Sequence, residues 1–339
     1  MTRQEKVRQR KQTRFTKFKR FALVFFLILF LSVIAYAGYV GSQIYMAWNK
    51  IQSAHLDVTD QDWEEQYKSK RKKTEPFTIL LLGVDNEGGK FVGRSDVLML
   101  AIVNPELEKV SLLSIPRDTY TKIVGKGVYD KINHAYAYGI KTALDTVEHF
   151  LDVPIDYYMV VNFDGFRDFI NVLGGLKIEA ERDMYHHYVI DNITIDIRQG
   201  ETVLNGDEAL YYVRFRKDAE GDFGRNRRQQ QVIRAVLDQT LDMRNVTKVA
   251  DILEVVGDNF RTNIPATEIL SMVRQFSSLS GDDVETLSFE ADVGSIDGIS
   301  YVFIDEEEQL RMQTELKRRL EPHFLTDTKH AKQSQGENY

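Results

Sequence analysis

Short apolar runs separated by polar segments predict most of the strands between positions 76 and 325. Runs of five to seven residues rich in Leu, Ile and Val are typical of buried strands. They predict strands over Phe77–Gly83, Val97–Val103, Val110–Ile115, Ile155–Val161, Leu176–Ala180, Ile193–Ile197, Val284–Phe289 and Ile299–Phe303.

Amphipathic segments lie between these runs. They predict helices over Lys141–Leu151, Asp164–Leu173, Phe223–Met243, Asn245–Asp258, Pro265–Phe276 and about 305–320. We expect Asp164 to be the N-cap of the second helix, and Gly174 and Gly175 to end it. Strands interspersed with helices predict an α/β fold, a single large α-β-α sandwich domain around a mainly buried mixed sheet.

The longest apolar stretch lies close to the N-terminus. No charged residue occurs from Phe21 to Asn49, and Phe21–Val40 has about the 20 residues that one helix needs to cross a bilayer. The sequence therefore predicts one transmembrane helix before the folded domain. A cleaved signal peptide is the rival interpretation, because Ala35–Ala37 is an A-x-A-like site. The uncharged stretch continues past that site to Asn49, which favours a retained signal anchor.

The charge distribution predicts the orientation of this helix. Residues 1–20 carry nine Lys/Arg and one acid, Glu5, which by the positive-inside rule places the N-terminus in the cytoplasm and the body outside the cell. The whole chain has a net charge of −7, and the body without this arm is still more acidic. An acidic body argues against a nucleic-acid partner, because Lys/Arg contacts with phosphate dominate that affinity. The chain has no cysteine, which excludes disulfides, zinc–thiolate sites and a cysteine nucleophile.

The predicted organisation has five parts. They are a basic cytoplasmic arm over 1–20, a transmembrane helix over 21–44, an extracellular stalk over 45–75, a folded domain over 76–325 and a disordered tail over 326–339.

Two carboxylates adjoin predicted strands. Asp85 follows the apolar run Phe77–Gly83, and Asp96 precedes the run Val97–Val103. A pair of carboxylates at adjacent strand ends can hold Mg²⁺, which prefers oxygen ligands and keeps phosphate or water among them. Each aspartate taken alone is more typical of a turn or a helix cap.

Basic side chains gather in three segments. Arg117 follows a strongly apolar strand, with a surface pair to Asp118 as the alternative, and Lys131 follows soon after. If residues 212–216 are extended, Arg214 and Arg216 face the same way, with Val213 and Phe215 turned to the core. Arg225, Arg228 and Gln229 share one face of the predicted helix over Phe223–Met243. Arginines in the first turns of a helix oppose its dipole, so we interpret this arrangement as an anion site that binds phosphate through guanidinium groups. We expect His134 to make a local hydrogen bond.

These segments, in this order, resemble the LytR-CpsA-Psr family of Gram-positive bacteria, most closely its LytR/TagU-like members. The motifs that carry the resemblance are LLGVD, GRSD, SIPRDTYTKIVGKGVYDKINHAYAYG, VNFDGF, FINVLGGL, LNGDEALYYVRFR and GDFGRNRRQQ. The resemblance covers about residues 76–260. It implies a phosphotransferase that moves a glycopolymer, such as wall teichoic acid, from undecaprenyl pyrophosphate to peptidoglycan.

The resemblance also implies roles for individual residues. Mg²⁺, or alternatively Mn²⁺, would lie between the pyrophosphate and the carboxylates of Asp85 and Asp96. The implied catalytic residues are Asp85, Asp96, Arg117 and Asp222. The implied substrate-binding residues are Arg117, Lys131, Arg214, Arg216, Arg225 and Gln229, to which the helix-face argument adds Arg228. Asp85 and Asp222 both remain candidates for the general base.

Three rival functions remain. Water as acceptor would make the chain a polyprenyl-pyrophosphate phosphatase with the same site. A non-enzymatic, membrane-bound transcriptional attenuator would need a DNA-binding module, and 20 cytoplasmic residues cannot form one. A non-catalytic tether for wall polymer would not need Asp85, Asp96 and the arginines.

Overall fold

The computed structural model describes Ser42 and residues 74–85, 91, 93–188, 193–216, 220–242, 259–264, 268, 272 and 281–321. The chain divides into two units, residues 1–49 and 50–339, and all described residues except Ser42 belong to the second. Several predicted segments lie outside the described residues. They are the arm, the transmembrane helix apart from Ser42, nearly all of the stalk, the tail, and the helices over Asn245–Asp258 and Pro265–Phe276 apart from positions 268 and 272. Within the described part, no helix is both long and apolar enough to cross a membrane.

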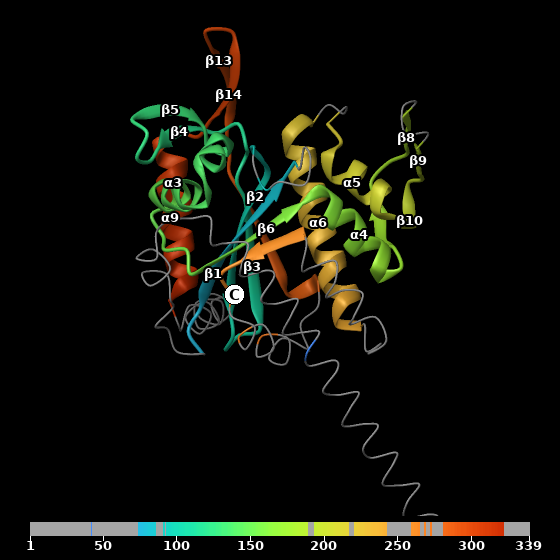
Figure 1. Cartoon of the computed structure of the whole chain (residues 1–339). Helices are drawn as coiled ribbons and strands as arrows, with labels where there is room; N and C mark the ends of the chain where they lie inside the picture. Colours follow the sequence, from blue (N-terminus) through green and yellow to red (C-terminus); the bar gives the residue numbers. More distant parts are fainter. Residues whose placement is uncertain are drawn as a thin grey trace, which may run out of the picture. The chain divides into compact units, whose positions relative to one another are not determined.

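A six-stranded mixed sheet runs through the second unit (Figure 1). Its order is β11-β6-β1-β2-β3-β12, with bounds Phe260–Thr262, Tyr157–Asn162, Phe77–Val84, Ser95–Asn104, Lys109–Ser114 and Val284–Ser288. The β1–β6 and β3–β12 pairs are parallel, and the other neighbouring pairs are antiparallel. The predicted mixed sheet is therefore present. Five of its strands start and end within about two residues of the apolar runs, and β11 was not predicted.

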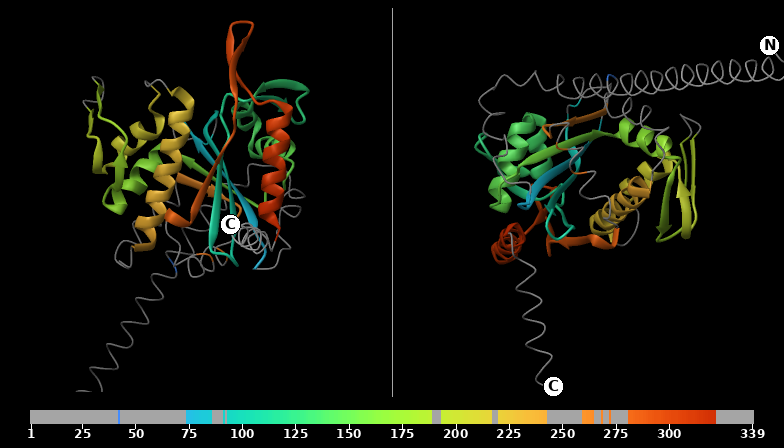
Figure 2. Two further views of the ribbon diagram at one scale, coloured as in Figure 1. Left: turned by 180° about the vertical axis from the view of Figure 1, so that it is seen from behind. Right: turned by 90° about the horizontal axis from the view of Figure 1, so that it is seen from below.

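Helices cover both faces of this sheet (Figure 2). On one face lie α3 and α9, over Ile140–Leu151 and Glu306–Leu320, where Val147 and Leu316 pack with Leu80 and Leu100. On the other side lie α4, α5 and α6, over Phe163–Leu173, Gly206–Arg214 and Gly221–Asp242. Burial of apolar side chains from both faces explains why the central strands read as nearly continuous apolar runs.

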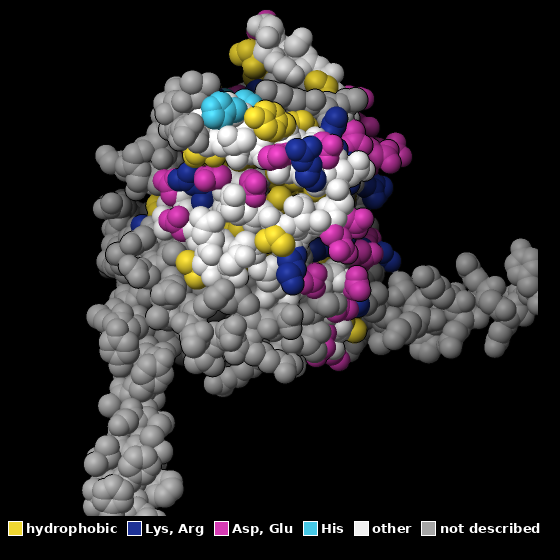
Figure 3. Space-filling model, turned by 90° about the vertical axis from the view of Figure 1, so that its right-hand side faces the viewer, with side chains coloured by type: hydrophobic (Ala, Val, Ile, Leu, Met, Phe, Trp, Pro, Cys, Tyr) yellow, Lys and Arg dark blue, Asp and Glu magenta, His cyan; other side chains and the backbone are white. Residues whose placement is uncertain are grey.

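Short two-stranded ribbons surround the sheet. They are β4–β5 (Tyr120–Ile123 and Val128–Lys131), β7–β10 (Leu176–Ala180 and Gly200–Leu204), β8–β9 (Met184–Tyr188 and Ile193–Ile197) and β13–β14 (Asp292–Ile296 and Ile299–Phe303). Two 3-10 helices lie over Ile132–Tyr138 and Gly281–Asp283. A second hydrophobic core joins α4, α5 and α6 to the strands β7, β8, β9 and β10. The surface on this side of the molecule carries both acidic and basic side chains (Figure 3).

The start of α4 differs from the prediction. Asn162, the last residue of β6, is the N-cap, and its side-chain oxygen accepts a hydrogen bond of 2.6 Å from the Gly165 amide. Asp164 lies inside the first turn and pairs with Arg167. The Asp164 cap was wrong because β6 leads directly into the helix, which leaves the capping position to the final strand residue. The helix ends at Gly174 in a left-handed conformation, as predicted.

The extended conformation considered for residues 212–216 is not found over 212–214. Residues Gly206–Arg214 form α5, whose start is fixed by a capping box. The Asn205 side chain accepts from the Glu208 amide at 3.0 Å, and the Glu208 carboxylate accepts from the Asn205 amide at 2.9 Å. Arg214 is therefore the last residue of a helix and Arg216 lies two residues beyond it, so the two do not alternate along a strand.

Candidate functional site

A register shift in the sheet places Asp96. Gly83 pairs with Val97, but the next residue, Val84, pairs with Ser95, so Asp96 has no cross-strand partner. An extra residue of this kind bends a strand locally and redirects a side chain. Gly83 permits the close approach, because a Cβ atom there would lie only 2.9 Å from Cβ of Val97. The pairing of β1 with β2 thus frees the Asp96 carboxylate to turn toward other segments.

The segment after β3 supplies the partner of Asp96. Arg117 forms an ion pair with Asp96, and its Nε lies 3.7 Å from the Asp118 carboxylate. Lys131, at the end of β5, approaches the other Asp118 oxygen at 3.0 Å. The structure therefore brings together Asp96, Arg117 and Lys131 as half-buried side chains. The alternative surface pair of Arg117 with Asp118 is the longer of the two Arg117 contacts.

The end of α5 supplies the partner of Asp85. The Arg214 guanidinium lies 3.9 Å from the Asp85 carboxylate, and each side chain is about half exposed. The same guanidinium lies over the Phe163 ring, 4.6 Å from its centre, a cation–π contact that steadies its position. Arg216 is exposed just beyond the helix. Phe163 was not predicted, although its place at the start of α4 beside the end of β6 is consistent with a supporting role.

Helix α6 carries the remaining predicted residues. Arg225, Arg228 and Gln229 are all buried, so they do share one face of the helix as predicted. Asp222 lies in the first turn, and its side chain is outside the described residues. A helix face shared by two arginines and an amide requires polar partners, since buried charge is costly without them.

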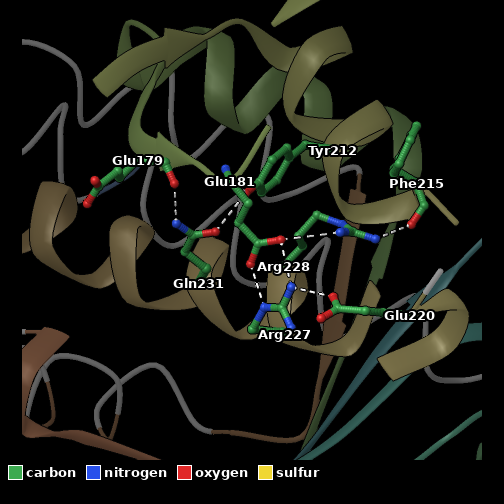
Figure 4. Close-up of polar contacts among 8 residues, drawn as sticks. All are labelled: Glu179, Glu181, Tyr212, Phe215, Glu220, Arg227, Arg228 and Gln231. Atoms are coloured by element: carbon green, nitrogen blue, oxygen red, sulfur yellow. Dashed lines mark hydrogen bonds and ion pairs between the residues drawn. The ribbon is translucent and has the colours of Figure 1, made fainter. Parts of the chain in front are cut away.

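The partners of Arg228 are protein groups, which differs from its predicted contact with substrate. Arg228 donates to the Phe215 carbonyl at 2.7 Å and pairs with Glu181 at 3.3 Å (Figure 4). Gln229 donates to the Val213 carbonyl at 3.3 Å. Both side chains therefore bind the end of α5. The helix-face pattern identified the shared face, but the pattern alone does not distinguish a ligand from a neighbouring helix.

Glu181, which follows β7, was missed by the sequence reasoning because no spacing marks a single loop glutamate. Hydrogen bonds from Arg227 lower the pKa of Glu181, against the opposing effect of burial, and Arg228 lowers it further. The same carboxylate raises the pKa of Arg227. Both groups are therefore charged, and the pair joins the end of β7 to α6 at the protein surface.

His134 makes the local hydrogen bond that was expected of it. Its Nδ1 lies 2.6 Å from the Asp130 carboxylate. Burial raises the pKa of Asp130, but the hydrogen bond from His134 and the Lys131 amide outweigh it, so that the pKa is lowered overall. This interaction shapes the segment that carries Lys131.

The donor set at the sheet end fits an Mg²⁺ ion that retains other ligands. No group of three or more His, Cys, Asp or Glu side chains suited to a metal occurs among the described residues. Asp85 and Asp96 offer oxygen ligands from neighbouring strand ends. Mg²⁺ is commonly held by one or two carboxylates together with water and substrate phosphate, so two protein carboxylates are sufficient.

A cavity of about 480 Å³ lies at the other end of β2 and β3, lined by residues that include Asn104, Lys109 and Arg319. Two of its basic groups have acidic partners, since Lys109 pairs with Asp283 and Arg319 pairs with Glu285, and Arg234 donates to the Thr286 hydroxyl. The cavity contains none of the predicted site residues. The chemistry therefore points to the opposite end of the sheet.

Comparisons with known proteins match nearly the whole described chain. A family model described as the LytR_cpsA_psr family matches residues 42–318. A protein of Halalkalibacterium halodurans named polyisoprenyl-teichoic acid–peptidoglycan teichoic acid transferase TagU is 38% identical over 293 residues, which covers 86% of this chain and 94% of that protein. The Bacillus subtilis protein of the same name is 36% identical over 307 residues, covering 90% and 97%.

Solved structures agree with these matches. The crystal structure of B. subtilis TagV has 36% identity and a TM-score of 0.65, and covers 74% of this chain and 98% of that one. The structure described as TagT bound to LI-WTA has 28% identity and a TM-score of 0.61, and covers 75% and 95%. The mixed sheet with its helices is thus shared with these proteins.

Proposed function

The chain belongs to the LytR-CpsA-Psr family, and from this premise we propose that it is an enzyme that transfers teichoic acid, or a similar anionic glycopolymer, from a polyisoprenyl carrier to peptidoglycan. The names of its relatives support the reaction class. The observation that carries the proposal is the pairing of Asp85 with Arg214 and of Asp96 with Arg117 at the ends of neighbouring strands. Such a site offers both cations for phosphate and carboxylates for a metal or a proton.

The arginines would bind the pyrophosphate of the carrier, which we propose is undecaprenyl pyrophosphate. Guanidinium groups donate two parallel hydrogen bonds to phosphate oxygens. Arg117 and Arg214 come from different segments, so they can donate hydrogen bonds to one ligand from two sides. Lys131 adds a third charge next to Arg117 through their shared partner Asp118. Charge in the transition state lies on the phosphoryl oxygens, and these cations would stabilise it.

The transfer step follows from this placement. A hydroxyl oxygen of a peptidoglycan sugar attacks the phosphorus that bears the glycan, and a new P–O bond forms. The bond from that phosphorus to the bridging oxygen breaks, and polyprenyl phosphate leaves. The hydroxyl proton passes to a carboxylate, for which Asp85 and Asp222 remain the candidates. Asp85 and Asp96 would also hold Mg²⁺, or alternatively Mn²⁺, which neutralises phosphate charge when bound.

Product analysis tests this function and separates it from hydrolysis. Full-length protein in detergent would be incubated with a lipid-linked teichoic acid precursor and peptidoglycan oligosaccharide. We expect mass spectrometry to detect glycan joined to the oligosaccharide through one phosphate, together with polyprenyl phosphate. Free phosphorylated glycan as the sole product would show a phosphatase instead.

We propose that the chain is a single-pass protein of the cell membrane, with its N-terminus in the cytoplasm and its body outside. The support is the uncharged stretch Phe21–Asn49 and the basic residues before it. Protease added to intact protoplasts should remove the body, and the mass of the mature protein should include residues 1–37. Protection of the body from protease would contradict this topology.

A further inference from the structure

Two side chains of α6 hold the end of α5. The last carbonyls of a helix have no partner within the helix. Arg228 donates to the Phe215 carbonyl at 2.7 Å, and Gln229 donates to the Val213 carbonyl at 3.3 Å. These two carbonyls flank Arg214, the residue that reaches Asp85. The backbone on both sides of Arg214 is therefore tied to α6. Figure 4 shows the contact of Arg228 with Phe215.

The guanidinium of Arg228 is buried among protein groups. It is 0% exposed, lies 3.3 Å from the Glu181 carboxylate and stands over the Phe215 ring, 5.3 Å from its centre. Glu181 is in turn held by Arg227, whose Nε lies 2.6 Å away. A phosphate could contact NH1 or NH2 of Arg228 only by displacing these partners. Arg228 therefore stabilises the structure around α5, and a phosphate ligand would bind to cations that are more exposed.

We infer that Arg228 is a positioning residue, which fixes the last turn of α5 so that Arg214 is held beside Asp85 at the end of β1. The inference rests on the proposed function, because it takes Arg214 as a phosphate-binding residue. Arg214 is about half exposed, and an exposed arginine loses much conformational freedom when it binds a ligand. Fixing its backbone, and stacking its guanidinium on Phe163, reduces that loss.

The geometry requires arginine at this position. The planar guanidinium donates from separate nitrogens, so that NH2 reaches Phe215 while NH1 faces Glu181. A lysine ammonium keeps the charge but has one nitrogen and no planar group, so it does not reproduce the two separate donors or the stacking on the ring. Arg228→Lys is therefore a conservative change that preserves charge and removes the bridge.

Hydrogen exchange tests the positioning directly. In the full-length protein in detergent, Arg228→Lys should accelerate amide exchange over residues 212–216 while exchange in β1 to β3 stays unchanged. Arg227→Lys is the matched control, since Arg227 contacts the same Glu181 but neither α5 carbonyl. Unaltered exchange over 212–216 in Arg228→Lys would overturn the inference, whether or not the protein transfers glycan.

A double-mutant cycle with inorganic pyrophosphate separates positioning from direct binding. Arg228→Lys should weaken pyrophosphate binding by roughly tenfold in the native background, and by less than about twofold when Arg214 is already alanine. Equal losses in both backgrounds would mean that Arg228 contacts the ligand itself, which contradicts the inference. A native protein that binds pyrophosphate but transfers no glycan would instead refute the proposed reaction alone.

Discussion

The ion pair of Asp85 with Arg214 at the sheet end can be broken at little cost in stability. Asp85 and Arg214 are 51% and 50% exposed and 3.9 Å apart. An exposed pair of this kind contributes only about 0–1 kcal/mol to stability. A pyrophosphate can therefore take Arg214 from Asp85 at little cost to the fold. The same reasoning applies less strongly to Arg117, which is more buried beside Asp96.

Arg214→Ala should consequently weaken pyrophosphate binding and hardly alter stability. A hydrogen bond to a charged group contributes about 1.5–3 kcal/mol, which corresponds to a loss of affinity of roughly ten- to a hundredfold. Titration calorimetry measures the affinity, and thermal unfolding measures the stability. Arg198→Ala is the control, because Arg198 is 71% exposed and pairs with Asp196 on a ribbon that carries none of the predicted residues. A lowered melting temperature with unchanged affinity would identify Arg214 as structural.

Glu181 should make stability depend on pH in the acidic range. Its pKa is lowered, first by the hydrogen bond from Arg227 and then by the charges of Arg227 and Arg228, against the effect of burial. A carboxylate with a lowered folded-state pKa contributes stability above its ordinary pKa of about 4.3, and loses that contribution as the pH falls through the lower value. Native protein should thus melt above Glu181→Gln at neutral pH, and the difference should shrink below about pH 4.5. A difference that stays constant down to about pH 3 would contradict this assignment.

The sequence predicted some site residues better than others for a physical reason. Asp96 and Arg117 adjoin long apolar strands, so their positions at the sheet end followed from the strands. Arg228 was predicted on the correct helix face, but its partner Glu181 is a single loop residue that no periodicity marks. Contacts between segments far apart in sequence depend on tertiary packing, which the local pattern does not contain.

At the scale of elements, the capping box of α5 is expected to stabilise a helix whose last residues have the alternation of a strand. Asn205→Ala removes the side-chain half of the capping box and should lower the free energy of unfolding by about 0.5–2 kcal/mol. Denaturant unfolding monitored by circular dichroism measures the change. Asn205→Ser retains a capping oxygen and should restore most of the loss. Equal stability of Asn205→Ala and the native protein would show that packing alone fixes this helix.

The same capping box explains how α5 could have been predicted. Asn205 followed three residues later by Glu208 is a helix-start signature, and it precedes the apolar residues Ala209 and Leu210. The alternation of Val213 and Phe215 with arginines suggested a strand instead. Helix α5 has only nine residues, and the apolar and basic residues at its end alternate as they would in a strand.

Three ribbon strands, β7, β9 and β14, were predicted with the bounds that the structure has, whereas their partner strands and both strands of β4–β5 were missed. Both strands of β4–β5 contain exposed residues, and β13 has no buried residue. Without a buried face the sequence has no period of two to reveal a strand. The central strands, buried on both sides, were predicted within about two residues of their ends.

At the scale of the whole molecule, strand order could not be obtained from the sequence. β6 lies beside β1 although residues 85–156 separate them, and β12 lies beside β3. This order places the ends of β1, β3 and β6 and the start of β2 at one end of the sheet. Segments from across the domain therefore converge there, with Arg117, Phe163 and Arg214 as examples.

This convergence predicts that a divalent cation and pyrophosphate bind with positive coupling. While Arg117 and Arg214 pair with Asp96 and Asp85, their charges are balanced. A pyrophosphate that takes the arginines leaves two unpaired carboxylates beside an anion, and a divalent cation removes that repulsion. Mg²⁺ should therefore raise the affinity for pyrophosphate, and glycan transfer should stop in excess chelator.

Variants that keep the shape of the site distinguish this coupling from formation of magnesium pyrophosphate in solution. The double change Asp85→Asn and Asp96→Asn removes both charges and retains side-chain size, so its pyrophosphate affinity should respond only weakly to Mg²⁺. Calorimetric titrations of both proteins with and without Mg²⁺ share the same solution equilibrium, so the difference between them measures the site. Equal responses in the two proteins, or full transfer by the native chain in chelator, would show that these carboxylates hold no metal. The arginines would then neutralise the pyrophosphate alone, and the carboxylates would serve to orient them.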